Sequence, residues 1–151
     1  MTIEERIENY KATSAADAYI IGITYNETVY ELVVDEIPDF CFKGDHESKS
    51  HGGAAKIRFR LTMAEKRKII RMGATPIGTA KEILTGRKNK GEAWEKYQTE
   101  KAGQEWRKDS TPYYMDGDLT VDGVKYQIKF EDASFANEST IEDGMRYKGA
   151  R

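Results

Sequence analysis

One short segment, Met115 to Glu131 (MDGDLTVDGVKYQIKFE), constrains the fold more than any other part of the chain. Two runs rich in β-branched and aromatic residues flank Asp122-Gly123, and this dipeptide is among the strongest short-range signals for a two-residue type I′ turn. Such a turn sets the pairing of the strands on either side, so Asp118 is expected to lie opposite Gln127. The segment therefore predicts a β-hairpin.

The alternation of side chains divides this hairpin into an apolar face and a polar face. The apolar face carries Leu119, Val121, Val124, Tyr126, Ile128 and Phe130, and the polar face carries Asp116, Asp118, Thr120, Lys125, Gln127, Lys129 and Glu131. Opposed residues of an antiparallel pair have Cβ atoms about 5 Å apart. The side-chain oxygens of Asp118 and Gln127 are then close enough to share one hard cation, with Lys129 one pleat further on.

An aspartate on one strand and Gln-x-Lys on the next resembles the PD-(D/E)XK nuclease superfamily. Asp118 matches the metal-binding aspartate of that superfamily, and Gln127-Ile128-Lys129 matches its (D/E/Q)-x-K element. Members commonly add a glutamate from a preceding helix, and Glu95 in the sequence GEAWE fits that place, with Glu92 as the alternative. The resemblance covers residues 91–131 and does not extend to the first 55 residues.

The resemblance implies metal-assisted hydrolysis of phosphodiester bonds. Asp118, Glu95 and the Gln127 oxygen would hold Mg²⁺ or Mn²⁺, which lowers the pKa of a bound water. Lys129 would orient that water and stabilise charge developing on the phosphorus oxygens. The role of Asp116 stays open between a second metal ligand, a partner for Lys129 and a charge near the turn.

Two departures from the family pattern support a second interpretation. Gln127 replaces the commoner acid, so one metal ligand is neutral, and only 22 residues follow Lys129 where the family fold continues with a helix and a strand. Either the N-terminal hairpin supplies the missing sheet, or a homodimer or other oligomer is the active form, or the fold is a different one. The alternative function is a catalytically silent nuclease-fold protein of phage or mobile-element origin, which binds nucleic acid or inhibits a host defence protein.

The net charge is −2, but its distribution is uneven. Residues 56–90 sum to +9, whereas residues 1–55 sum to −7 and residues 91–151 to −4. Cations that hold a phosphate backbone beside carboxylates that gather at a metal are typical of a protein acting on nucleic acid, here expected to be DNA. The same segment could instead be a solvated helix face. The candidate phosphate contacts are Lys56, Arg58, Arg60, Lys66, Arg67, Lys68, Arg71, Arg87, Lys88 and Lys90.

Local patterns predict an α+β fold with a mixed or antiparallel sheet and flanking helices, and the resemblance implies a restriction-endonuclease-like core around the C-terminal hairpin. Asp17 to Val34 is expected to form a first hairpin that turns at Asn26-Glu27, and residues 55–61 alternate like a strand. A capping box, Thr62-Met63-Ala64-Glu65, predicts a helix from there to Met72. Helices are also expected at 79–84 and 92–102, and a turn at 74–78, whereas residues 1–10 could form a short charged helix or fray.

We expect one domain over residues 1–151, in which residues 1–60 could form a hairpin subdomain beside a nuclease-like core at 61–151. No apolar run approaches the roughly 18–20 residues that span a bilayer. The charged start of the chain is unlike a signal peptide, and Cys41 has no second cysteine to pair with. These features indicate a cytoplasmic setting with no membrane partner.

Overall fold

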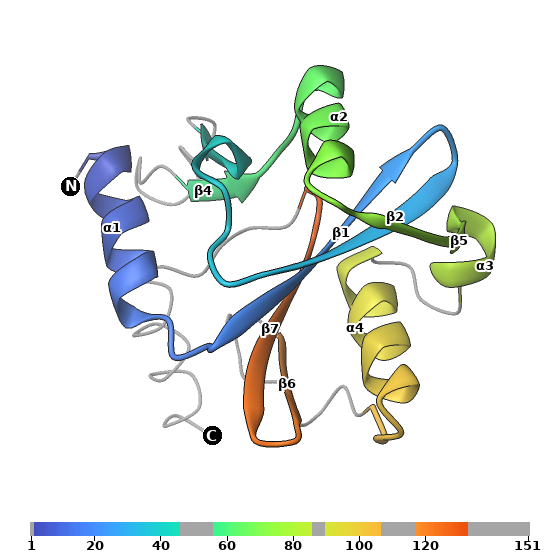
Figure 1. Cartoon of the computed structure of the whole chain (residues 1–151). Helices are drawn as coiled ribbons and strands as arrows, with labels where there is room; N and C mark the ends of the chain where they lie inside the picture. Colours follow the sequence, from blue (N-terminus) through green and yellow to red (C-terminus); the bar gives the residue numbers. More distant parts are fainter. Residues whose placement is uncertain (1, 46–55, 86–89, 107–116, 133–151) are drawn as a thin grey trace, which may run out of the picture.

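The structure is a computed structural model that describes residues 2–45, 56–85, 90–106 and 117–132. These segments form an α+β fold, as the sequence predicts, with a five-stranded mixed sheet, a separate two-stranded sheet and flanking helices (Figure 1). The helices are α1 (Ile3–Thr13), α2 (Met63–Arg71), α3 (Ala80–Ile83) and α4 (Lys90–Lys101), with a 3-10 turn η1 (Asp39–Cys41). The strands are β1 (Ala18–Tyr25), β2 (Thr28–Val34), β3 (Phe42–Asp45), β4 (Lys56–Phe59), β5 (Thr75–Thr79), β6 (Gly117–Val121) and β7 (Val124–Phe130).

Strand β1 lies at the centre of the large sheet, whose order is β5-β2-β1-β7-β6. It pairs with β2 as an antiparallel hairpin and with β7 in parallel. The β1–β2 turn is Asn26-Glu27, and both residues have positive φ angles, 50° and 65°, as a type I′ turn requires. Strands from residues 1–60 and from residues 61–151 therefore share one sheet.

The two faces of this sheet are covered by different elements (Figure 1). On one side, here called the α1–α2 face, β1 directs Tyr19, Ile21 and Ile23 against α1, α2 and the β3–β4 pair. On the other side, the α3–α4 face, Ile128 and Phe130 of β7 form a core cluster with Trp94 of α4, and Ala80 and Ile83 of α3 pack against this cluster. Because residues alternate along a strand, each position of β7 belongs to one of these two layers.

Local sequence signals explain the elements on the α1–α2 face. Thr62 caps α2, and the reciprocal hydrogen bonds of the capping box with Glu65 are both present. Gly73 follows the helix with a φ of 107°, a conformation in which an L side chain would be strained. In β4, Ile57 and Phe59 are fully buried, as the alternation of this strand predicts.

The prediction of a turn at residues 74–78 is wrong. Thr75–Thr79 forms β5, which pairs with β2 at the edge of the large sheet. Pro76 is compatible with this place because an edge strand leaves one row of backbone N–H groups outside the ladder. The β2–β5 pairing also shifts register between Val29 and Tyr30, so this edge is irregular.

Candidate functional site

The C-terminal hairpin has the register that the sequence predicts. Strands β6 and β7 pair antiparallel with Asp118 directly opposite Gln127. The turn residues Asp122 and Gly123 have positive φ angles of 51° and 80°, which is the geometry of a two-residue type I′ turn. The backbone of Asp118 is described in β6, whereas its side chain and the whole of Asp116 lie outside the described part of the chain.

Gln127 and Lys129 lie on the α1–α2 face of β7. Their parallel partners on β1 are Tyr19 and Ile21, which both belong to the core of that face. Lys129 is 6% exposed, so its side chain is almost completely removed from water. Charge–charge interactions are stronger in such a place than at the surface, because the effective dielectric constant is lower.

Helix α1 covers Gln127. The Tyr10 hydroxyl donates to Gln127 Oε1 at 3.0 Å, and the Ser14 hydroxyl approaches the same oxygen at 3.4 Å. Ser14 also shares a hydrogen bond of 2.6 Å with the hydroxyl of Tyr19. The oxygen that the metal hypothesis requires is therefore contacted by two hydroxyl groups, one from α1 and one from its C-cap.

The structure does not bring Glu95 to Gln127 and Lys129. Glu95 and Glu92 belong to α4, whose Trp94 is fully buried on the α3–α4 face, 5.4 Å from the ring of Phe130. Phe130 and Lys129 are neighbours on β7, so their side chains point to opposite faces of the sheet. The helix glutamate of the family pattern thus lies across the sheet from the other candidate ligands.

Helix α1 does not supply a replacement carboxylate. Its glutamates, Glu4, Glu5 and Glu8, are exposed, whereas Tyr10 faces the sheet. In the described part of the chain, no three histidine, cysteine or carboxylate side chains come together to hold a metal ion. Mg²⁺ commonly keeps several waters and binds proteins through one or two carboxylates. The backbone register, which sets Asp118 opposite Gln127, is compatible with such a partly hydrated ion.

A buried ion pair lies beside Lys129. Glu131 follows it by two residues, about 7 Å along the strand, and its carboxylate is 2.8 Å from Lys66 Nζ of α2. The exposed fractions of the two side chains are 18% for Lys66 and 5% for Glu131. Glu131 also accepts from the Thr24 backbone N–H at 2.8 Å and from the Thr24 hydroxyl. This pair ties α2 to the end of β7.

The candidate phosphate contacts fall into three groups. The side chains of Arg60, Arg67, Lys68 and Arg71 are exposed on or just before α2, and we call these four residues the basic face. Lys66 forms an ion pair with Glu131. Arg58 is half-buried and approaches the Asp132 carbonyl at 3.4 Å. Lys90 is exposed on α4, on the other side of the sheet. Arg87, Lys88 and the side chain of Lys56 lie outside the described residues.

Comparison of the chain with protein-family models, with curated proteins and with solved structures finds no match.

In the described segments, no helix is long and apolar enough to cross a membrane.

Sequence reasoning missed Tyr10, Ser14 and the ion pair of Lys66 with Glu131. Tyr10 and Gln127 are 117 positions apart, and no local pattern joins residues at that separation. One signal was present: Ile3, Ile7 and Tyr10 recur at helical spacing, which predicts that this side of α1 packs against a sheet. It does not indicate which strand.

Proposed function

We propose that this chain is a Mg²⁺- or Mn²⁺-dependent nuclease that hydrolyses phosphodiester bonds in nucleic acid, with DNA as the expected substrate. The observation that carries the proposal is the register of β6 and β7, in which Asp118 opposes Gln127 and Lys129 follows two residues later. This is the spacing of the family pattern. It arises from a two-residue turn that leaves no freedom of register.

Asp118 and Gln127 would hold the ion through their side-chain oxygens. When bound, the ion polarises a phosphoryl oxygen and makes a water a better nucleophile at neutral pH. Lys129 would donate to the oxygens of the scissile phosphate, whose negative charge grows during attack. Its 6% exposure favours this role, because a charge that water does not screen stabilises a developing anion more strongly.

The basic face would position the nucleic-acid backbone. Arg67 and Arg71 are four residues apart on α2 and both are exposed, so they lie one above the other on the same side of the helix. The Lys66–Glu131 pair joins this helix to the strand that carries Lys129. Phosphate groups held by α2 would therefore lie at a constant distance from the candidate site.

Cleavage of supercoiled plasmid and of labelled single strands tests the proposal, with Mg²⁺ and then Mn²⁺. The variants are Asp118→Asn and Lys129→Met, which keep the approximate shape of each side chain. Lys125→Met is the matched control, since it removes a lysine from the same strand and the same face two residues before Gln127. Metal-dependent cleavage lost in the first two variants and kept in the control supports the enzyme. Equal cleavage by all four proteins, or none by any, excludes it.

A second candidate function is a protein that binds nucleic acid on this scaffold without cutting it. The observation that favours it is the place of α4, which keeps Glu95 across the sheet from Gln127. The two candidates differ in what metal does to the fold. A site that binds the ion only in the folded state raises the melting temperature as metal is added. The binding protein would keep its affinity for nucleic acid in EDTA and show no metal-dependent shift.

A further inference from the structure

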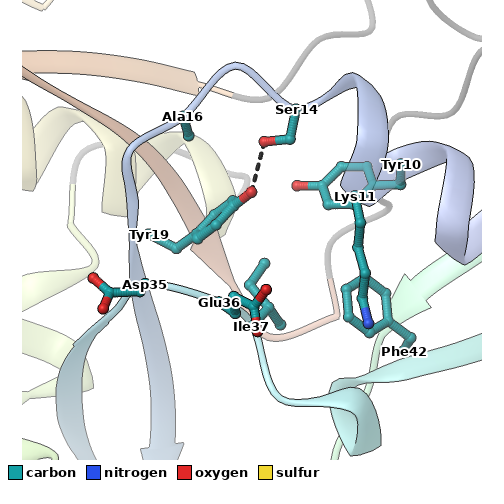
Figure 2. Close-up of a pocket in the computed structure, with 9 residues that line it drawn as sticks. All are labelled: Tyr10, Lys11, Ser14, Ala16, Tyr19, Asp35, Glu36, Ile37 and Phe42. Carbon is teal, nitrogen blue, oxygen red and sulfur yellow. Dashed lines mark hydrogen bonds between the residues drawn. The ribbon is translucent and has the colours of Figure 1, made fainter.

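The last turn of α1 makes a contact with the candidate metal site that the family pattern does not contain. Tyr10 is 4% exposed, and its hydroxyl donates to Gln127 Oε1 at 3.0 Å. Figure 2 shows this hydroxyl directed toward the bonded Ser14 and Tyr19 hydroxyls, at one end of a pocket of about 190 Å³. The three groups come from α1, its C-cap and β1, so the backbone holds them in fixed relative positions.

A glutamine differs from an acid in a way that makes such a contact important. The two ends of a carboxylate are both oxygen, whereas only one end of an amide can bind a cation. The terminal torsion of glutamine is broad and roughly two-fold, so an amide without partners presents its NH₂ group as readily as its oxygen. A hydrogen-bond donor directed at Oε1 favours one of these two orientations.

The hydrogen bond from Tyr10 leaves one lone pair of the Gln127 oxygen for a cation. An amide oxygen has two lone pairs, and the bond from Tyr10 needs only one of them. The second is approached by Ser14 at 3.4 Å, which is longer than a normal hydrogen bond between oxygens. Ser14 has a stronger partner in Tyr19 at 2.6 Å, so a cation displaces only the weak contact.

We infer that Tyr10 is a positioning residue, which turns the Gln127 amide so that its oxygen faces the divalent cation. The inference rests on the proposed function, since it needs the cation to bind. It also accounts for glutamine at a position where the family pattern usually has an acid. Outer hydrogen bonds to metal ligands typically change metal affinity by 10- to 100-fold when they are removed.

Binding of Mn²⁺ to the whole chain, measured by isothermal titration calorimetry, tests this role without any cleavage assay. Tyr10→Phe should weaken binding by about 10-fold. In the Gln127→Glu background the same substitution should have no effect, because both ends of the new side chain are oxygen. Tyr126→Phe is the matched control, since it removes a tyrosine hydroxyl from the same strand as Gln127 but on the α3–α4 face of the sheet. Urea unfolding in EDTA checks that each variant is folded.

The outcomes separate the inference from the function on which it rests. If the wild type takes up no Mn²⁺, the metal-dependent function fails and the role of Tyr10 fails with it. If the wild type binds Mn²⁺ and Tyr10→Phe binds it equally well, only the role of Tyr10 is overturned. An equal loss in the Gln127 and Gln127→Glu backgrounds also overturns it, because that result identifies Tyr10 as a packing residue.

Discussion

Replacing Lys66 by methionine should destabilise the fold far more than replacing any cation of the basic face. Lys66 Nζ is 2.8 Å from the Glu131 carboxylate and also donates to the Thr24 carbonyl at 2.8 Å. The Glu131 side chain is 5% exposed, so water cannot replace the lost ammonium group. Methionine has a similar length and leaves little empty space, so the main effect is a buried carboxylate without its counter-ion.

The size of the effect follows from the burial of the pair. Removing one partner of a buried ion pair costs about 3–5 kcal/mol. Lys66 is 18% exposed, which places the expected cost near the lower end, at about 3 kcal/mol. For a chain of this length, each 1 kcal/mol lowers the melting temperature by about 2–4 °C, so the melting temperature should fall by about 6–12 °C. Arg67→Met, on the exposed side of the same helix, should stay within about 0.5 kcal/mol.

Urea denaturation measures this difference directly. The midpoint should fall in Lys66→Met with no change in the slope, because the surface exposed on unfolding is the same. The double variant Lys66→Met, Glu131→Gln should recover part of the loss, since it leaves no buried charge and keeps an acceptor for Thr24. A change below about 0.5 kcal/mol in Lys66→Met would show that the pair is solvated, and the reasoning from burial would fail.

Three further predictions concern stability and reactivity. Gly22→Ala should cost about 3 kcal/mol in urea unfolding, because a Cβ at this position would lie 2.6 Å from the Trp94 ring; wild-type stability would contradict this packing. Burial alone would raise the pKa of Glu65, but the hydrogen bond from the Thr62 backbone holds this pKa below its usual value. The stability that the Glu65 carboxylate contributes is therefore present at neutral pH and is lost on acidification below about pH 4.5. Glu65→Gln should therefore flatten the acid side of the stability curve, and an unchanged curve would exclude this source. Burial raises the pKa of Cys41 to about 12, so a thiol reagent at neutral pH should label the unfolded chain and not the native one, as mass spectrometry would show.

The features that sequence reasoning predicts well here are local. Asp122-Gly123 determines both the turn and the pairing of Asp118 with Gln127, because a two-residue turn leaves only one register. Thr62 and Glu65 similarly mark the start of α2, since the capping box is made by residues three apart. The exception is Pro76, which indicates a turn by its local preference but lies in an edge strand, where tertiary pairing outweighs that preference.

The features that sequence reasoning misses are those that depend on which face of the sheet a helix covers. Glu95 precedes Asp118 in the order expected for the family, yet its helix, α4, packs through Trp94 on the apolar face of β7. Chain order carries no information about the side of a sheet, because a connection can pass over either face. The contact between Tyr10 and Gln127 depends on the parallel alignment of β1 with β7. The sequence alone could not pair these two residues, because it does not reveal that alignment.

Helix α2 uses its cations in two different ways, and this difference links stability to the proposed function. Lys66 faces inward and binds Glu131, whereas Arg67 and Arg71 face solvent. If these two arginines contact phosphates, replacing them should weaken nucleic-acid binding and reduce its salt dependence by about one ion per contact, with the fold unchanged. Lys66→Met should instead lower stability first and should weaken binding only as α2 loosens from β7. Measuring the salt dependence of nucleic-acid binding and the free energy of unfolding on the same variants therefore distinguishes a residue that stabilises the packing of α2 from one that contacts nucleic acid.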